Sequence, residues 1–521
     1  MTTNDQHGTD AFRDSISTPD HVESRIGRLE FVDGAPTAET AGRVYDHLDF
    51  VYGVQAFLSG YPGASMHAIH RGLRSIGVED HSVLLFSELM DSQSVFLTAN
   101  CDTVYALSFL DLTDGPMILD VPRMPEGSAI LGTIDDLWFR WVTDVGVPGP
   151  DRGTGGRYLI VGPGHDGVLP DSGFHVSHAR TTHVIALLRA FMIDGDPERP
   201  AAAIREGLRI SPYRPGGAGT SVATFLGGGA PLTPVEPPTE TTFVEGSGVA
   251  FNTVPPNDAS YWEHMHDFIQ SQPSGAGDPD VLGLFAALGI SKGSPFAPDE
   301  RMRRVLDEAV AVGNATARTV SFAPREEEGF AYYEGSQWMN MLFLGGYEFL
   351  APPPEITPEG VVAVPDDGAR KLNARIAFFY PYTGITPAMC MRLTGIGSQY
   401  LIAVRDADGE YLDGSRTYRL TLPAGIPQAR FWSIMIYDRQ TRSMLQTGQR
   451  YPDIGSQVGD VREEEDGSTV IHLGPDEPEG RASNWLQTDP SRGFFAILRF
   501  YSPTAAFFDK SWRAGEITRV E

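Results

Sequence analysis

The six residues NCDTVY at 100–105 bring an amide, a thiol, a carboxylate and a phenol to the start of an apolar run. Because side chains alternate between the two faces of a strand, Asn100 and Asp102 are expected on one face and Tyr105 on the other. Such groups at the mouth of a strand can orient a substrate or transfer a proton, so Asp102, Asn100 and Tyr105 are the candidate catalytic residues. The alternative is that Asn100 and Asp102 cap a turn and satisfy backbone donors.

The thiol and the imidazoles give weaker signals. Cys101 has no accompanying Cys–His signature, which argues against a nucleophilic thiol. The histidines that lie close together in the sequence are His175, His178 and His183, and His264 and His266. Their spacings put no pair on one face of a strand or a helix, which favours histidines at surfaces and turns, and no metal ligand is named. The alternative is that ligands converge from distant segments of the chain. The sequence contains no phosphate-binding loop, nucleophile elbow or calcium loop, and it names no cofactor.

Aromatic side chains suggest an apolar pocket close to this polar stretch. Trp and Tyr favour walls that are partly wet, and the chain has more of them than one core needs. The candidate ligand-contacting residues are Trp138, Arg140, Tyr380 and Tyr382. Core packing is the alternative explanation for most of the aromatic residues.

Two arginines, Arg189 and Arg499, interrupt apolar runs. A buried guanidinium is costly unless it is paired. Asp136 and Asp438 end the preceding apolar strands and are the plausible partners. We interpret these four residues as structural ion pairs rather than catalytic groups, since structural pairs are more common.

The elements that must position these residues are mostly strands. From about 95 to 188, and again from 416 to 512, short apolar, β-branched and aromatic runs are cut by Pro, Gly, Asn and Asp. This pattern is typical of successive antiparallel strands. The predicted fold class is therefore mainly β with a helical insert (α+β): two antiparallel β-sandwich or barrel domains bridged by helices.

The expected organisation has four parts. They are a flexible arm at 1–40, an N-terminal β domain at 41–215, a Gly/Pro-rich connection with a helical segment at 216–364, and a C-terminal β domain at 365–521. A helix beginning near residue 38 should end at Gly60 and Pro62. Helical patterns recur at 257–272 and 298–320, whereas the run at 182–195 could be a helix or a strand.

The residues that end or interrupt the predicted strands recur in the same order in the two β regions. Pro122 and Pro423, Asp136 and Asp438, Gly162 and Gly474, and Arg189 and Arg499 recur in the same order at offsets of 301, 302, 312 and 310 residues. This order favours two copies of one β fold. The alternative is that any two antiparallel domains share Pro and Gly-Pro turns.

Longer motifs carry a resemblance to a known pair of domains. FWSIMIYD, a Gly-Pro, NWLQT, FFAILRFY and FFDKSW, in that order, resemble the domain of unknown function 1214. Upstream, YGVQAFLSGYP, NCDTVY, YLIVGPG and LLRAFMIDG resemble its usual N-terminal companion, the domain of unknown function 1254. The resemblance covers roughly 45–515 and implies no mechanism. In that family the second position of NCDTVY is usually arginine, so a role of that charge does not carry over to Cys101.

Size and composition exclude several classes of protein. A chain of 521 residues favours two or three domains, and a formal net charge of -28 argues against nucleic acid and anionic membranes as partners. The two cysteines, Cys101 and Cys390, form no disulfide framework. No apolar run is long enough to span a membrane, and the first thirty residues lack an export signal, although relatives often have one, so a cytoplasmic location is expected.

The function expected from the sequence is a small-molecule enzyme, most plausibly a hydrolase, with its pocket near the strand at 100–105. The alternative is a binding or scaffold protein that holds a small ligand without turning it over. A small-molecule ligand is the expected partner, and a homo-oligomer is compatible with the sequence.

Overall fold

The computed structural model describes residues 15–230, 240–351, 368–457 and 461–520, with two short strands at 356–357 and 360–361. The described chain is mainly β, with several separate sheets and a set of helices. The predicted fold class, mainly β with a helical insert, is confirmed at this level. Parts of the predicted arm and of the predicted connection, at 1–14, 231–239, 352–355, 358–359 and 362–367, lie outside the described residues.

Contacts divide the chain into two compact units. One contains residues 15–60, 256–270 and 277–316, and the other contains 61–255, 271–276 and 317–520. Both β regions, with the residues that link them in space, belong to the second unit. The two β regions therefore share one compact unit.

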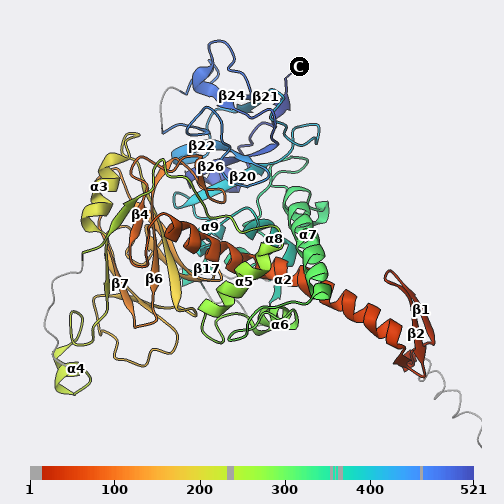
Figure 1. The fold of residues 1–521 in the computed structure, drawn as a ribbon. Coiled ribbons are helices and arrows are strands. Elements are labelled where there is room, and N and C mark those ends of the chain that lie inside the picture. The colour runs from red at the N-terminus through yellow and green to blue at the C-terminus, as the bar shows by residue number, and fades with distance from the viewer. Residues whose placement is uncertain are drawn as a thin grey trace, which may run out of the picture. The chain divides into compact units, whose positions relative to one another are not determined.

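The first unit is mostly helical (Figure 1). Its helical elements come from α2 (Ala38–Ser75), α5 (Ser260–Ser271), α6 (Pro279–Ala287) and α7 (Glu300–Phe322). A Cβ placed on Gly53 would lie 2.5 Å from Cβ of Ala309, so α2 and α7 approach closely there. Trp262 of α5 donates from Nε1 to the carbonyl of Leu306 at 3.0 Å. The chain before these helices forms a small sheet of β1 (His21–Ser24), β2 (Gly27–Val32) and β3 (Ala35–Pro36).

The end predicted for the first helix is wrong. α2 continues through Pro62 as far as Ser75. Proline inside a helix removes one hydrogen bond and clashes with the preceding turn. Residues 60–66 are buried without interruption, and such burial provides most of the stability of a helix in a protein.

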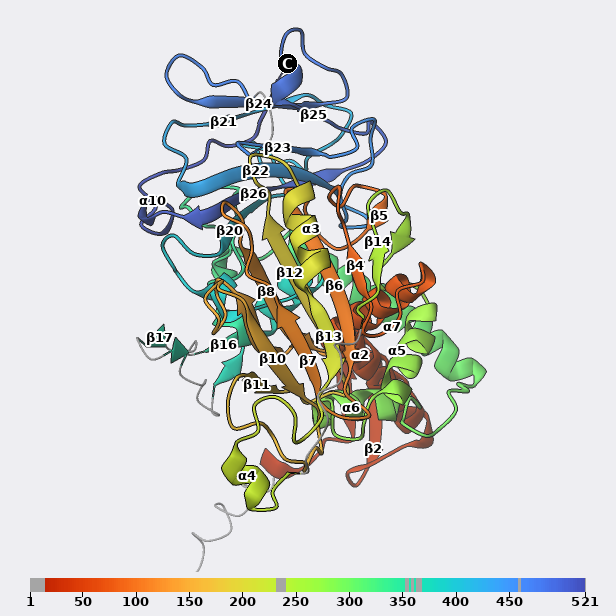
Figure 2. The ribbon, with the colours of Figure 1, turned by 90° about the vertical axis from the view of Figure 1, so that its left-hand side faces the viewer.

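The N-terminal β region comprises the strands from β4 to β14 (Figure 2). Its larger sheet has the order β14-β4-β6-β12-β8-β9, with bounds β14 (Phe243–Glu245), β4 (Val83–Leu85), β6 (Thr103–Asp111), β12 (His183–Phe191), β8 (Ile130–Asp136) and β9 (Trp141–Gly146). Its smaller sheet has the order β11-β10-β7-β13, with bounds β11 (His175–His178), β10 (Gly156–Val161), β7 (Met117–Val121) and β13 (Arg209–Pro212). The segment that could have been helix or strand is thus the central strand β12.

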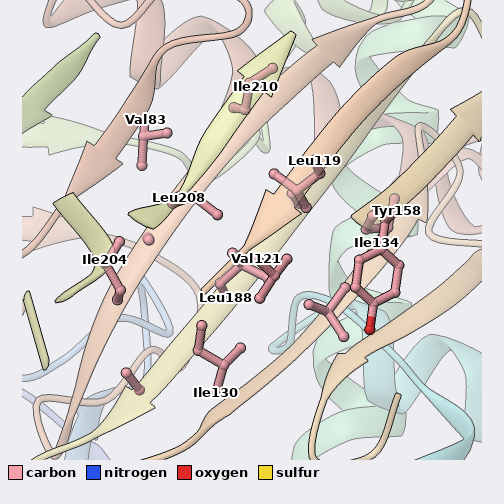
Figure 3. Packing of buried hydrophobic residues seen from close by; sticks show 14 of the residues in the cluster. Val83, Leu119, Val121, Ile130, Ile134, Tyr158, Leu188, Ile204, Leu208 and Ile210 are labelled. Atoms are coloured by element: carbon pink, nitrogen blue, oxygen red, sulfur yellow. The ribbon is translucent and has the colours of Figure 1, made fainter. Parts of the chain in front are cut away.

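The two sheets share one cluster of buried hydrophobic residues. Leu119, Tyr158 and Ile210 come from the smaller sheet and Ile134 and Leu188 from the larger one, and all five are buried in one cluster (Figure 3). The helix α3 (Glu198–Gly207) adds Ile204 to the same cluster and contacts β6 and β12. Burial on both sides explains why β6 and β12 read as nearly continuous apolar runs.

The C-terminal β region comprises the strands from β20 to β27. One sheet has the order β20-β26-β22-β23, with bounds β20 (Ser398–Ala403), β26 (Phe494–Pro503), β22 (Gln428–Asp438) and β23 (Asp453–Gly455). The other has the order β25-β24-β21-β27, with bounds β25 (Trp485–Gln487), β24 (Thr469–Gly474), β21 (Tyr418–Leu422) and β27 (Thr518–Arg519). Buried side chains of both sheets belong to a second hydrophobic cluster.

The remaining described elements are short. They are β5 (Ser94–Val95), α4 (Val222–Leu226), β15 (Phe251–Asn252), β16 (Leu350–Ala351), β17 (Ile356–Thr357), β18 (Gly360–Val361), β19 (Ala369–Arg370), α8 (Leu372–Phe379), α9 (Pro387–Cys390), α10 (Ala505–Phe508) and three 3-10 turns at 326–328, 346–348 and 482–484.

Two details differ from the expected architecture. In the described chain the outer strands of every sheet have a single neighbour, so the closed-barrel alternative is wrong. The sheets are also not purely antiparallel, because β11 runs parallel to β10, β25 to β24 and β14 to β4. In the part of the chain that the structure describes, no helix has both the length and the apolar character needed to cross a bilayer.

Candidate functional site

A partly enclosed cavity lies where the N-terminal and C-terminal β regions meet. It offers about 110 Å³ to the centres of water-sized molecules, which is room for several waters or a small organic ligand. Its walls come from both regions and from the segments at 340–342 and 378–389. All of these residues belong to the same compact unit.

Two arginines line this cavity, one from a strand of each β region. Arg189 lies on β12, where its register partner on β6 is Tyr105. Arg499 lies on β26, where its register partner on β20 is Tyr400. All four residues line the cavity. Each β region therefore contributes one guanidinium and one phenol.

The guanidinium of Arg499 is buried and only partly satisfied. Its Nη2 donates to the carbonyl of Thr98 at 3.1 Å and to the hydroxyl of Tyr437 at 2.5 Å. Its Nε and Nη1 are buried and find no hydrogen-bond partner among the described residues. Arg189 is half-buried and lines the cavity, and the described residues include no hydrogen bond or ion pair to its guanidinium.

The predicted partners of these arginines are wrong. Asp438 forms its ion pair with Arg492 at 3.1 Å, and Asp136 forms one with Arg140 at 2.6 Å. In the strand register Arg499 lies opposite Ser433, five residues from Asp438, and Arg189 lies opposite Leu131, five residues from Asp136. Five residues of strand span about 17 Å, which is too far for an ion pair.

Asp136 and Asp438 stabilise the turns that follow their strands. Asp136 Oδ1 accepts from the backbone N–H groups of Trp138 and Arg140 at 2.8 and 3.0 Å. Asp438 Oδ1 accepts from those of Gln440 and Thr441 at 2.5 and 3.2 Å. Both carboxylates are thus engaged in turns, and each receives one arginine on its other oxygen.

Asp102 connects the two β regions and does not line the cavity. Its side chain is buried, Oδ2 accepts from the hydroxyl of Ser433 at 2.6 Å and Oδ1 accepts from the hydroxyl of Tyr501 at 2.7 Å. Gln457 donates to its backbone carbonyl at 2.8 Å. Both carboxylate oxygens are occupied by donors from the other region, so the open side that a general acid or base needs is taken.

Asn100 and Tyr105 lie together at the cavity wall. Asn100 Nδ2 donates to the hydroxyl of Tyr105 at 2.9 Å, and its Oδ1 accepts from the hydroxyl of Thr103 at 2.8 Å. The prediction that Asn100 shares a face with Asp102 is therefore wrong. Alternation applies only within a strand, and β6 begins at Thr103, so Asn100 belongs to the preceding turn.

One of the four predicted ligand-contacting residues lines the cavity. Tyr382 does so, and its buried hydroxyl has no hydrogen-bond partner among the described residues. Tyr380 instead accepts from Nη1 of Arg442 at 2.7 Å, and that guanidinium lies 4.0 Å above the Tyr380 ring. Trp138 is buried away from the cavity, and Arg140 binds Asp136 and the carbonyl of Ala276 at 2.5 Å.

Buried carboxyls behind the cavity wall have altered acidity. Burial raises the pKa of Asp135 to about 8 and that of Asp144 to about 7. Asp135 Oδ2 accepts from the backbone N–H of Ile385 at 3.1 Å, next to Gly384 and Thr386 of the wall. Burial, followed by the charge of Asp102, also raises the pKa of Asp453 well above its usual value. These three carboxyls therefore tend to keep their protons near neutral pH.

The thiols and imidazoles are not grouped for chemistry. Burial raises the pKa of Cys101, so the thiolate is scarce there. His175 and His178 lie on β11, His183 on β12, and His264 and His266 on α5. Among the described residues no three or more His, Cys, Asp and Glu side chains are arranged to hold a metal ion.

Several lining residues were not predicted from the sequence. Tyr400, Ser398 and Asn340 bring polar groups, and Leu342 and Met341 bring apolar ones. Tyr400 lies opposite Arg499 in the strand register. The sequence predicts strands but not which strands pair, so it gave no reason to place Tyr400 at the cavity. Asn340 and Met341 follow α7 in a segment without regular secondary structure, which carries no pattern that would place it here.

Family models match both β regions. Residues 82–212 match the model described as protein of unknown function DUF1254, and residues 397–505 match the model of DUF1214. The two matched regions follow one another in that order along the chain. The resemblance seen in the sequence is confirmed, and the cavity lies where the DUF1254 and DUF1214 domains meet.

Of two similar solved structures, the first shares the fold. The VPA0106 protein of Vibrio parahaemolyticus is 18% identical, with 91% of this chain and 100% of that chain covered and a TM-score of 0.51. An uncharacterised protein of Burkholderia cenocepacia is 10% identical, with 93% of this chain and 97% of that chain covered and a TM-score of 0.37. No curated protein matches this chain.

Proposed function

We propose that the protein binds a small molecule in the cavity where the two β regions meet. The observation that carries this proposal is a buried space whose polar groups lack protein partners. The hydroxyl of Tyr382 and two nitrogens of Arg499 are unsatisfied among the described residues, while most other lining side chains are apolar. An apolar pocket with a few convergent polar groups is the usual form of a ligand site.

Binding without turnover is better supported than hydrolysis. No carboxylate, imidazole or thiol occurs among the described residues that line the cavity. Asp102, the candidate general acid or base, has both oxygens occupied by Ser433 and Tyr501. Acid–base hydrolysis needs a titratable group within reach of the substrate, and the lining offers only hydroxyl, amide and guanidinium groups.

Hydrolysis is a second candidate because of the carboxyls behind the wall. Asp144 and Asp135 have pKa values raised by burial to about 7 and about 8, close to the working range of a general acid. Asp135 accepts from the hydroxyl of the lining residue Thr133 at 3.1 Å. In this candidate the Thr133 hydroxyl relays a proton between Asp135 and the bound substrate. If so, Asp135→Asn would remove turnover and leave ligand affinity unchanged.

A blocking variant tests the binding proposal. Met389 lies in α9 and lines the cavity, whereas Met391 directly follows α9 and does not. Small organic fragments are screened by ligand-observed NMR against the full chain. We expect competing hits that are lost in Met389→Trp and kept in Met391→Trp, the matched control.

Two results would reject or revise this proposal. Hits that survive Met389→Trp, or a screen without hits, would show that the cavity is not a ligand site. Mass spectrometry of the recovered hits separates the two candidate functions, because intact fragments support binding and cleaved fragments support hydrolysis.

We also propose that each β region is a two-layered sandwich and that the two are copies of one fold. The order β6-β12-β8-β9 corresponds to β20-β26-β22-β23, and β11-β10-β7-β13 corresponds to β25-β24-β21-β27. The pairs β10/β11 and β24/β25 are both parallel, a detail that shared turn chemistry does not explain. An experimental structure in which the two regions fail to superpose strand for strand would refute the duplication.

A further inference from the structure

We propose that the ligand of this cavity is an organic carboxylate with an apolar body, and that its carboxylate lies between Arg189 and Arg499. This inference rests on the proposed function and adds the chemical class of the ligand. It starts from the two guanidinium groups, which come from different sheets and line the same space. Guanidinium groups stay charged in proteins, so the cavity has two permanent cations.

The described residues leave these cations under-compensated. Arg499 has two buried nitrogens without a partner, and Arg189 has no hydrogen bond or ion pair with another described residue. Asp102 attracts both guanidinium groups electrostatically. Its oxygens, however, accept from Ser433 and Tyr501 rather than from either arginine.

Charge balance selects the kind of anion. Burial and the charge of Asp102 raise the pKa of the neighbouring Asp453 well above its usual value, so this second carboxyl keeps its proton. The two guanidinium groups then have the carboxylate of Asp102 as their ionised neighbour, which leaves one excess positive charge at the cavity. An unpaired charge in a buried site is costly, and a bound anion removes that cost. A carboxylate carries one negative charge, which matches the excess, and its two oxygens suit guanidinium donors.

The walls select the rest of the ligand. Apart from these polar groups, the cavity is lined by side chains such as Phe96, Leu131, Leu187, Met341, Leu342 and Phe378. An inorganic phosphate would lose hydration on every side and leave these apolar surfaces without contact. An apolar body attached to the carboxylate gains free energy by covering them.

Titration calorimetry with shape-matched probes tests this inference on the full chain. Phenylacetate and phenylacetamide have nearly the same shape and differ in charge. We expect phenylacetate to bind at least about tenfold more tightly than phenylacetamide, since hydrogen bonds to charged groups contribute more than neutral ones. Inorganic phosphate is expected to bind more weakly than phenylacetate.

Arginine variants locate the effect. Arg189→Gln and Arg499→Gln should bring the affinity ratio of the two probes to about one, whereas Arg419→Gln, at an exposed position on β21, should leave the ratio unchanged. The comparison of probes with the unaltered protein decides the question even if a variant fails to fold.

The contrary outcomes are separable. Equal affinity of acid and amide, or phosphate binding more tightly than phenylacetate, would overturn the carboxylate inference and leave the binding proposal standing. The same holds if neither probe binds while neutral fragments sensitive to Met389→Trp do. If no fragment of any kind is sensitive to Met389→Trp, the proposed function fails together with this inference.

Discussion

Each β region places an arginine opposite a tyrosine, but the carboxylate that joins the two regions through side-chain hydrogen bonds comes from the N-terminal region. Arg189 faces Tyr105 in the N-terminal region, and Arg499 faces Tyr400 in the C-terminal region. Asp102 directly precedes β6, whereas a glycine directly precedes β20. The two arginines and the two tyrosines line the cavity, whereas Asp102 joins the two regions. The arginine–tyrosine pairs found in both regions thus shape the cavity, and the carboxylate found before β6 holds the regions together.

The strongest way to break this comparison is to remove the carboxylate. In Asp102→Ala the buried hydroxyls of Ser433 and Tyr501 lose their acceptor and the nearby arginines lose an anion. We expect the free energy of unfolding to fall by about 3 kcal/mol or more, measured by urea denaturation. Asp111→Ala, at the half-exposed far end of β6, should cost about 1 kcal/mol or less. Equal losses in the two variants would show that Asp102 does not join the regions.

A second experiment compares the aspartates that end β8 and β22. Both accept from two backbone N–H groups and one arginine. The side chain of Asp136 is 1% exposed and its arginine 24%, against 10% and 47% for Asp438 and its arginine. We expect Asp136→Ala to cost about 2–3 kcal/mol and Asp438→Ala about 1 kcal/mol in urea denaturation, because exposed pairs contribute little. The reverse order would contradict the assignment of matching roles.

The smallest expected effect is a pH dependence that the N-terminal region contributes. Asp135 and Asp144, with pKa values raised by burial to about 8 and about 7, keep protons that the unfolded chain releases above about pH 4. Their contribution to stability is complete below about pH 4 and is lost as the pH rises toward 8. Asp144→Asn stays neutral, so the fall in Tm between about pH 5 and pH 7 should be shallower than in the unaltered protein.

A control at an exposed turn position, Asp114→Asn, should show the fall in Tm of the unaltered protein. An unchanged slope in Asp144→Asn would mean that this carboxyl is ionised in the folded protein.

The sequence was sufficient to predict the strands but not which strands pair or in what register. Period-two patterns and turn residues predicted strand ends at Asp136 and Asp438, because these depend on local chemistry. The arginine that binds each aspartate is decided by the register between strands. That register places Arg189 and Arg499 five residues along the neighbouring strand from Asp136 and Asp438. The same limit applies to Asp102, whose two donors lie more than 300 residues away in the chain.

Within the site, residue type predicted more than detailed role. Asn100, Tyr105, Tyr382 and the two apolar-run arginines all reach the cavity. Their surroundings could not be derived from a pattern, because the wall is completed by the segment at 340–342, where no periodicity operates. Helix α2 is a second example, because tertiary burial stabilises it beyond Pro62 although Gly60 and Pro62 predict its end.

The buried contacts between the β regions have a consequence for how the protein can be divided. Phe191 and Leu131 of the first region share a hydrophobic cluster with Phe431 and Tyr501 of the second, and the rings of Phe431 and Tyr501 stack at 4.0 Å. The boundaries at 82–212 and 397–505 cut through this cluster and through the hydrogen bonds of Asp102. Either segment expressed alone would expose an apolar face and a charge that has lost its donors. We therefore expect the two matched regions to unfold as one cooperative unit, and they should be expressed and exchanged together.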